Sequence, residues 1–273
     1  MRAKLGFLAV AAAVAVLLLA VPGSVGARAV APFGATTASF GGLPTVGTPS
    51  VLLHYNSTGS AGYEVGQSIN STMTILNASW LEPSVNCTSK NTTVLFDGIM
   101  LTNLSAQVAG TELACRAGVA TQWAFYASST VNVTNITRIS QATLPLSSGN
   151  AVRISIIHSK TTVTFLFTIG THKFGKVLPS SGRDFVAAVG VTGYPVSTGI
   201  LPLANFGTVA FGASFTKITG TNDVKVGGVN KALGSFLRVA ELTLVDSKNH
   251  KLAVPTALSG SGSSFKVTWK AST

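Results

Sequence analysis

The chain has 273 residues, of which 46% are hydrophobic and 10% charged, with a formal net charge of +11. This length is enough to bury a substantial core without metals or many disulfides. The excess of cations favours anionic partners such as cell-surface polymers, and the alternative is that it serves solubility alone. The cations are scattered and no recognition helix is evident, so we expect no nucleic-acid partner.

The N-terminus has the pattern of a secretory signal peptide. Arg2 and Lys4 precede an apolar run from Leu5 to Val21, and small residues follow as far as Ala27. This order predicts cleavage after Ala27, so that residues 1–27 are removed and the protein is secreted or held at the cell surface. The alternative is a retained membrane anchor, for which about 17 apolar residues is the short limit. No later apolar stretch is long enough to span a bilayer, so we expect no membrane span after signal removal.

The rest of the chain divides into two parts. Residues 28–58 are rich in Ala, Gly, Thr and Pro and predict a leader, linker or pro-segment. Residues 59–273 contain runs such as 152–156, 162–169 and 265–269, in which apolar and polar residues alternate. Many short strands of this kind, separated by Gly, Pro, Asn and Ser, predict one all-β domain, either a sandwich or a sheet closed on itself.

The two cysteines and the sequons fit an exported protein. Cys87 and Cys115 can pair, and closing that loop stabilises a fold by about 3–4 kcal/mol. Two cysteines and four dispersed histidines lack the spacing of a zinc site, and no Gly-rich phosphate loop is present, so we expect no metal and no cofactor. Eight Asn-x-Ser/Thr sequons are candidates for glycosylation: Asn56, Asn70, Asn77, Asn86, Asn91, Asn103, Asn132 and Asn135.

Two hydrolase classes have little support. No serine lies in a Gly-x-Ser-x-Gly elbow, and the histidines fall in unrelated contexts, with His158 and His172 expected to face solvent. A glycosidase needs two acids about 5–10 Å apart. The candidates for such a pair are Glu64, Glu112 and Asp184, and structuring the turn beside Cys115 is the simpler role for Glu112.

Six segments in order carry a family resemblance. Residues 78–87 (Ala-Ser-Trp-Leu-Glu-Pro-Ser-Val-Asn-Cys) resemble the motif Gly-Thr-Trp-x-Val-Pro-x-Val-x-Cys, and residues 110–115 (Gly-Thr-Glu-Leu-Ala-Cys) resemble Gly-Thr-Glu-Ala-Asp-Cys. The other segments are 60–63, 201–211, 255–258 and 264–269. Together they resemble the glutamic peptidases, or eqolisins, which are exported acid-acting endopeptidases. The resemblance implies a two-sheet antiparallel β-sandwich of concanavalin-like type and supports pairing of the two cysteines.

The resemblance also implies a catalytic Gln–Glu pair, in which Glu activates a water as general base and Gln stabilises the oxyanion. Anchoring on residues 110–112 places Val108 at the Gln position, with Gln107 one residue earlier. A one-residue offset turns the side chain to the opposite face, so Gln107 serves only if a bulge re-aims it. Asp184 takes the place of the Glu with a side chain one methylene shorter. The alternative role for Asp184 is an ion pair or turn hydrogen bond with Arg183.

Other functional positions of the family are altered. Met100 stands where the family has Asp, Ala127 stands where it has Glu, and the nearby Asp97 is expected at the surface. The aromatic residues persist, so that Trp123, Phe125 and Tyr126 are predicted to line a ligand cleft, with core packing as the alternative. We therefore expect a non-catalytic protein that binds a polypeptide or glycan. The alternative is a divergent acid-acting glutamic endopeptidase that uses Asp184, with or without Gln107.

Overall fold

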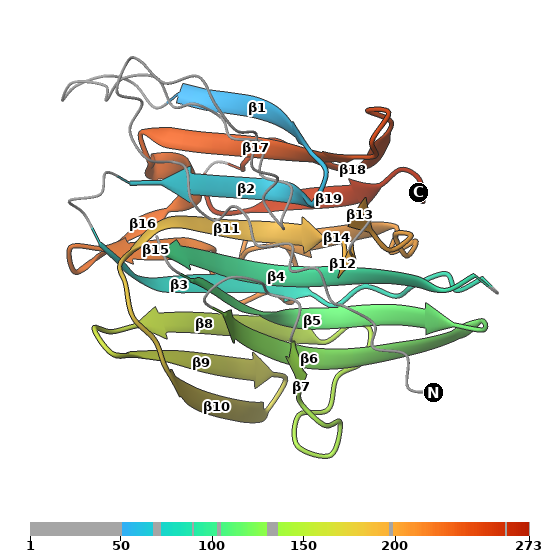
Figure 1. Ribbon diagram of the computed structural model, residues 1–273, viewed down its shortest axis with the longest axis horizontal. Coiled ribbons are helices and arrows are strands. Elements are labelled where there is room, and N and C mark those ends of the chain that lie inside the picture. Colours follow the sequence, from blue (N-terminus) through green and yellow to red (C-terminus); the bar gives the residue numbers. More distant parts are fainter. Residues whose placement is uncertain are drawn as a thin grey trace, which may run out of the picture.

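The computed structural model describes residues 51–272 except 68–71, 89, 103–104, 130–135, 197–198 and 260. The described residues form nineteen β-strands and one short 3-10 turn, η1 (Leu233–Ser235), and contain no α-helix (Figure 1). The all-β class predicted from the sequence is therefore confirmed. None of the described segments is a helix of the length and apolarity needed to cross a membrane. The predicted signal peptide, residues 1–27, lies outside the described residues.

The largest set of neighbouring strands is named here the long ladder. Its hydrogen-bonded order is β1 (Val51–Ser57), β17 (Arg238–Val245), β2 (Ser60–Gly66), β11 (Asp184–Thr192), β4 (Thr92–Thr102), β5 (Ala106–Arg116), β6 (Val119–Ser129) and β7 (Thr137–Arg138). All of these pairs are antiparallel except β1 with β17. Because Val51–Ser57 pairs along its whole length, this part of the predicted leader belongs to the fold.

A second set, the short ladder, has the order β10 (His172–Pro179), β9 (Thr162–Ile169), β8 (Ala151–His158), β3 (Met73–Leu81), β15 (Asp223–Val226) and β16 (Val229–Ala232). The ladders are joined through β18 (Lys251–Pro255), β19 (Phe265–Trp269) and β14 (Thr208–Phe211), which run from β17 to β3. With the single pair between β3 and β11, these pairings close a ring of seven strands. A small hairpin, β12 (Pro195–Val196) with β13 (Gly199–Ile200), completes the strands.

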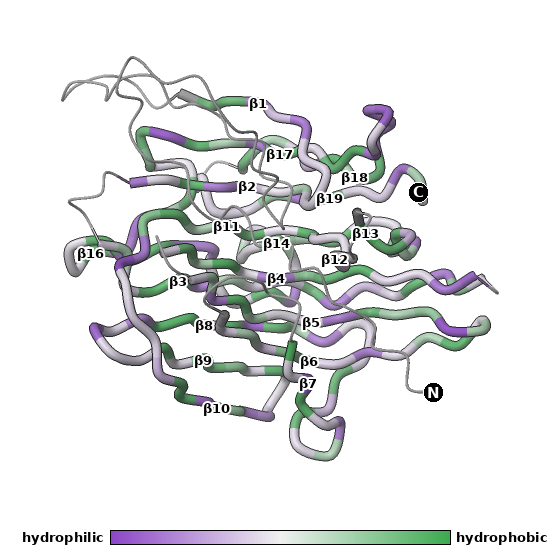
Figure 2. Tube along the Cα trace, viewed as in Figure 1, coloured by the Kyte–Doolittle hydropathy of each residue, from purple (hydrophilic) through white to green (hydrophobic). Residues whose placement is uncertain are grey.

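Burial follows the alternation of side chains along each strand. In β9, Val163, Phe165 and Phe167 are buried while Leu166 between them is 42% exposed. The main core combines such residues from the short ladder with side chains of the long ladder, among them Phe96 and Ala187. Strands β4 and β5 are buried along almost their whole length, so both faces of the long ladder are covered there. Figure 2 shows the hydrophobic stretches running along the strands of both ladders.

The face of the long ladder opposite the main core is named here the second face. It carries its own apolar cluster, formed by Leu95, Ile99, Ala106, Val108, Phe125 and Ala127. One row of residues across this face needs glycine at three strands, because Gly62 pairs with Gly190, Gly190 with Asp97, and Asp97 with Gly110. A Cβ at Gly190 or Gly110 would lie 2.2 Å from a backbone carbonyl oxygen. These glycines therefore let the backbones approach closely on either side of Asp97.

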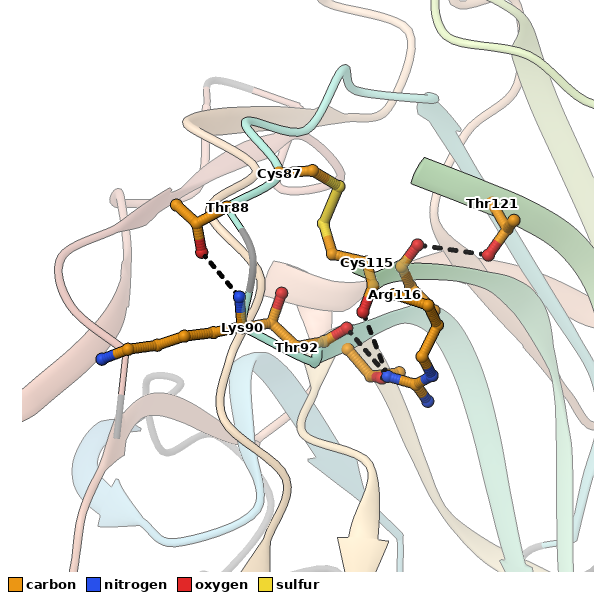
Figure 3. Close-up of a disulfide and its surroundings, with 9 residues drawn as sticks. Cys87, Thr88, Lys90, Thr92, Cys115, Arg116 and Thr121 are labelled. Carbon is orange, nitrogen blue, oxygen red and sulfur yellow. Dashed lines mark hydrogen bonds between the residues drawn. A yellow bond between two sulfur atoms is a disulfide. The ribbon is translucent and has the colours of Figure 1, made fainter. Parts of the chain in front are cut away.

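The predicted disulfide between Cys87 and Cys115 is present and ties the segment before β4 to the end of β5 (Figure 3). Beside it, the guanidinium of Arg116 donates hydrogen bonds to the backbone oxygens of Cys115 and Thr92. Thr121 Oγ1 in β6 donates to the backbone oxygen of Ala114, 3.2 Å away. The disulfide thus fixes the end of the β5–β6 hairpin against the chain that leads into β4.

Candidate functional site

Strand register shows which residues share the second face. One row across the long ladder consists of Leu53, Ala240, Glu64, Ala188, Ile99, Val108 and Ala127. Val108, the position that the resemblance assigns to the catalytic Gln, lies second from the β6 end of this row and is 1% exposed. At this point the second face is therefore apolar and buried.

Gln107 lies on the core side of β5, where it pairs across the ladder with Met100. The pairing of β5 with β4 and with β6 has no register shift, so no bulge re-aims the side chain. Its Nε2 donates hydrogen bonds of 2.8 Å to Ser105 Oγ and 2.9 Å to Ser180 Oγ. Gln107 is therefore buried with its amide N–H groups already engaged.

Asp184 begins β11 opposite Thr102, and the register shifts between Asp184 and Val186. The carboxyl group is fully buried, and its Oδ2 lies 2.5 Å from His158 Nδ1. Burial raises the pKa of Asp184, while the hydrogen bond and charge of His158 lower it. The partner of Asp184 is thus His158, whereas Arg183, the partner considered from the sequence, is exposed.

The prediction that His158 faces solvent is wrong, because it follows Ile154 and Ile156 on the core side of β8 and is 6% exposed. His172 is exposed, as predicted. A hydrogen bond between Thr102 and Ser105 links the surroundings of Asp184 to those of Gln107. Within the described part of the chain, Gln107 Oε1, His158 Nε2 and Asp184 Oδ1 have no hydrogen-bond partner. The two sequence candidates thus share the core side of the ladder as parts of one buried polar cluster.

The three aromatic residues predicted for a cleft divide between the two faces. Phe125 is buried in the cluster of the second face, and Trp123 lies half-buried farther along β6. Tyr126 points the other way and stacks on Phe165 and Phe174, at centroid distances of 5.4 and 6.2 Å. For Tyr126 the core role holds, because adjacent residues of a strand face opposite sides.

An ion pair crosses the second face beside Trp123. The guanidinium of Arg138 in β7 donates two hydrogen bonds, of 2.6 and 2.9 Å, to the buried carboxylate of Glu112. This hydrogen bonding raises the pKa of Arg138. The same guanidinium lies 5.3 Å from the centroid of the Trp123 ring. Glu112 therefore holds Arg138 over the indole, a role that the sequence did not predict.

Three further carboxyl groups have perturbed pKa values. Burial raises the pKa of Glu64 and of Asp97, both in rows of the second face, to about 7. Asp97 is 1% exposed, contrary to its predicted surface location; Thr192 Oγ1 donates to its Oδ1 at 3.1 Å. On the core side, burial also raises the pKa of Glu82 to about 7, although Trp80 and Thr111 donate hydrogen bonds to it. The pairing of β5 with β4, of β4 with β11 and of β11 with β2 shows that Glu64 and Asp97 lie on the same face as Val108.

Four of the eight sequon asparagines lie among the described residues. Asn56, Asn86 and Asn91 are exposed. Asn77 is half-buried in β3, where its Nδ2 donates to Asp223 Oδ1 at 2.8 Å, so a glycan there would displace this hydrogen bond. The others, Asn70, Asn103, Asn132 and Asn135, lie outside the described residues. The part of the chain that the structure describes contains no group of three or more His, Cys, Asp or Glu residues arranged to hold a metal ion.

Comparison with known proteins yields likeness in structure alone. No protein-family model and no curated protein matches the chain. Scytalido-glutamic peptidase, solved with a transition-state analogue inhibitor, superposes with a TM-score of 0.60 at 14% identity over 78% of this chain and 98% of its own. SCP-B, a member of the eqolisin family solved with the tripeptide Ala-Ile-His, gives a TM-score of 0.56 at 16% identity over 78% and 98%. Aspergilloglutamic peptidase from Aspergillus niger gives 0.50 at 14% over 66% and 99%. As the sequence resemblance predicted, the chain has a glutamic peptidase-like fold.

Proposed function

We propose that this protein is an exported, non-catalytic member of the glutamic peptidase-like fold that binds a polypeptide or glycan without hydrolysing it. The N-terminal signal pattern and the disulfide support export. The net charge of +11 supports attachment to an anionic cell-surface polymer.

One observation carries the proposal: the second face is apolar at the position where the family resemblance expects the catalytic Gln. Val108 occupies that position, between Ile99 and Ala127 of the same row. A valine side chain has no donor for an oxyanion, and Ile99 and Ala127, which flank it, have no base for a water; the carboxyl group of the same row, Glu64, lies three strands away. Asp184 and Gln107, which have the required groups, are buried on the core side and hydrogen-bonded to protein partners.

We also infer that the two ladders are the two sheets of the sandwich expected from the resemblance. What supports this is that the main core takes side chains from both ladders, such as Phe96 from β4 and Phe165 from β9. The connection through β18, β19 and β14 then serves as a hydrogen-bonded seam between the sheets.

A second candidate function is a divergent acid-acting glutamic endopeptidase that uses Asp184 as general base. The observation in its favour is the 2.5 Å contact between Asp184 and His158, together with the raised pKa of the carboxyl group. Catalysis there would require the chain between β10 and β11 to open, because a general base must come within hydrogen-bond reach of the attacking water.

A cleavage assay separates the two functions. The mature chain is incubated with reduced, carboxymethylated serum albumin from about pH 2 to pH 7, a range that brackets the titration of carboxyl groups. The variant is Asp184→Asn, which keeps the side-chain shape, and the matched control is Asp246→Asn in an exposed turn. We expect no cleavage by any of the three proteins. Acid-dependent cleavage that Asp184→Asn abolishes and Asp246→Asn retains would overturn the proposal in favour of the endopeptidase.

A further inference from the structure

The acidic and basic residues of this protein lie at different depths. None of the eight Asp and Glu residues is exposed, and five of them are buried. Of the sixteen Lys and Arg residues that the structure describes, thirteen are exposed. Two of the three half-buried acids are hydrogen-bonded, Glu241 to Tyr63 and Asp246 to the backbone N–H of Lys248. The described surface therefore carries many cations and few carboxylates that could pair with them.

Strand register places three of these cations on one face of a sheet. The face is the side of the short ladder that points away from the main core, and it is named here the outer face. Its first row contains Lys173, Thr168 and Arg153, and its third row ends at Lys225. The residues of β9 on this face are half-buried or exposed, with Leu166 in the second row at 42%. The described chain thus leaves the outer face open to solvent.

The three cations are spaced regularly across the strands. In the order β10, β9, β8, β3 and β15, Lys173 lies on the first strand, Arg153 on the third and Lys225 on the fifth. Neighbouring strands are about 4.8 Å apart, so successive cations are separated by about 10 Å across the ladder. Figure 1 shows β8, β9 and β10 side by side at one end of the molecule. A linear polymer that crosses these strands obliquely can therefore meet all three cations.

The charges of the outer face are not neutralised by the protein. Within the part of the chain that the structure describes, none of the three cations takes part in a salt bridge. The one described acid on this face, Asp223, is 9% exposed, and its carboxylate accepts hydrogen bonds from Asn77 and Thr221. The three cations are therefore free to pair with an anionic ligand.

Protection of a sheet edge explains only one of these cations. Lysine on an edge strand discourages pairing with another chain, which is a sufficient role for Lys173 in β10. Arg153 and Lys225 lie on β8 and β15, which are hydrogen-bonded to a strand on either side. Their positions are not edge positions, so a binding role accounts for them better.

The groups around the cations indicate the kind of polymer. The half-buried hydroxyl-bearing residues Thr164 and Thr168 lie between the cations, and Leu166 and Val177 add aliphatic side chains that are 42% and 58% exposed. A guanidinium such as that of Arg153 pairs with a carboxylate through two parallel hydrogen bonds. Hydroxyl groups pair with sugar hydroxyls, and aliphatic side chains pack on sugar C–H groups. An acidic polysaccharide offers all of these groups along one chain.

We propose that the outer face of the short ladder binds an acidic polysaccharide, with Lys173, Arg153 and Lys225 pairing with its anionic groups. This inference rests on the proposed binding function and assigns its anionic polymer to a defined surface. The surface lies on the short ladder, apart from the apolar row of the second face that contains Val108.

The test is isothermal titration calorimetry of the mature chain with polygalacturonate, which carries carboxylates, and with dextran sulfate, which carries sulfates. Uncharged dextran, poly-glutamate and phosphatidylserine vesicles are measured beside them. We expect at least one acidic polysaccharide to bind, more weakly at high NaCl because salt screens exposed charges, and dextran not to bind. The two acidic polysaccharides show which anionic group is preferred. Failure of both to bind the folded chain would overturn the proposal.

A triple variant removes the cations of the outer face: Lys173→Gln, Arg153→Gln and Lys225→Gln. It should lower the association constant about tenfold, since each exposed ion pair contributes modestly. The matched control removes the same net charge elsewhere, at exposed positions on or beside β18 and β19: Lys248→Gln, Lys251→Gln and Lys270→Gln. The control should lower the constant less than about threefold. Equal losses in the two triple variants would show that net charge alone attracts the polymer and would overturn the proposal. Tighter binding of poly-glutamate or of the vesicles, lost in the first triple variant, would also overturn it in favour of that partner.

A measurement on the unaltered chain covers the case in which the substitutions impair folding. Lysines are acetylated with and without the bound polysaccharide, and the extent at each position is read by mass spectrometry. Lys173 and Lys225 should be protected, while Lys248 and Lys270 should react as in the free chain. Equal protection at all four positions would contradict a defined surface.

These outcomes are distinct from failure of the proposed function. Cleavage of albumin by a chain that still binds the polysaccharide through the outer face would overturn the non-catalytic role and leave this surface standing. Absence of both cleavage and polysaccharide binding would leave the non-catalytic fold and remove the surface.

Discussion

The two sides of the long ladder stabilise their buried polar groups in different ways. On the second face, the carboxylate of Glu112 is neutralised by Arg138, while Asp97 receives one hydroxyl from Thr192. On the core side, Glu82 receives an indole N–H and a hydroxyl, and Asp184 is hydrogen-bonded to His158. A cation thus compensates one buried acid, whereas hydroxyl and indole donors leave Glu82 and Asp97 with raised pKa values.

The buried carboxyl groups are therefore not gathered on one side of the long ladder. The perturbed acids lie on both sides of the ladder, and Asp97 and Glu82 have neighbours that serve to satisfy hydrogen bonds. Carboxyl groups with a purely structural role can have perturbed pKa values, as catalytic carboxyl groups do. Because burial raises the pKa values of Glu82 and Asp97, the folded state favours their protonated forms. The free energy of unfolding should therefore depend on pH, which can be measured.

The largest expected effect is a loss of stability as the pH rises. Glu82 and Asp97 have folded-state pKa values of about 7, above those of the unfolded chain, so the stability they contribute is complete below pH 4 and is lost as the pH rises through 7. Each group should lower the free energy of unfolding by roughly 3 kcal/mol between pH 4 and pH 8. Urea unfolding at the two pH values measures the change.

Two isosteric variants identify the groups responsible. Glu82→Gln and Asp97→Asn remove the ionisation and keep a side-chain oxygen for Thr111 and Thr192. Each variant should be more stable than the parent at pH 8 and nearly equal to it at pH 4. A parent-like loss of stability in both variants would show that other groups cause it.

The next largest effect concerns two neighbouring aromatic residues on opposite sides of β6. Tyr126 stacks on Phe165 in the main core, whereas Trp123 is half-buried on the second face beside Arg138. Tyr126→Ala should cost about 3–4 kcal/mol of unfolding free energy because it leaves a cavity. Trp123→Ala should cost roughly 1 kcal/mol, as a partly exposed position. Equal losses in thermal or urea unfolding would contradict the division of these residues between the main core and the second face.

A smaller effect tests the ion pair of the second face. Removing the guanidinium with Arg138→Ala leaves the buried carboxylate of Glu112 without its cation, which should cost about 2–4 kcal/mol, at the lower end because Arg138 is partly exposed. The double variant Arg138→Ala with Glu112→Gln should recover part of this loss. Arg153→Ala, at an exposed position of β8, is the control for removal of an arginine. Equal stability of the single variant and the parent would show that the pair contributes nothing.

Alternation and resemblance together predicted much of the fold. The strands around residues 152–156 and 162–169 are present, and so is the disulfide between Cys87 and Cys115. The offset between Gln107 and Val108 also followed from the two-residue period, since the regular pairing of β5 keeps Gln107 on the core side. Continuing the alternation through Ile154 and Ile156 would have identified His158 as buried.

The contacts that define the polar clusters could not be predicted in this way. His158 meets Asp184 because the end of β8 and the start of β11, in different ladders, lie close together, and no local pattern encodes that approach. Asp97 was misassigned because β4 is buried on both faces, where alternation no longer separates inside from outside. The partnership of Glu112 with Arg138 depends on the short strand β7, for which two residues give no periodic signal.

The smallest expected effect comes from the residue on which the alternative function depends. Asp184→Asn keeps an oxygen that can accept a hydrogen bond from His158 Nδ1, and it removes a carboxyl group whose pKa is raised by burial. The substitution should therefore change the free energy of unfolding by less than about 1.5 kcal/mol. Asp184→Ala should cost about 2–3 kcal/mol, because the buried imidazole loses its partner. Urea unfolding of the parent and the two variants at pH 5 measures both changes. If Asn and Ala are equally disruptive, the carboxylate charge itself is needed beside His158, and the Asp184–His158 pair is more than a neutral hydrogen bond in the core.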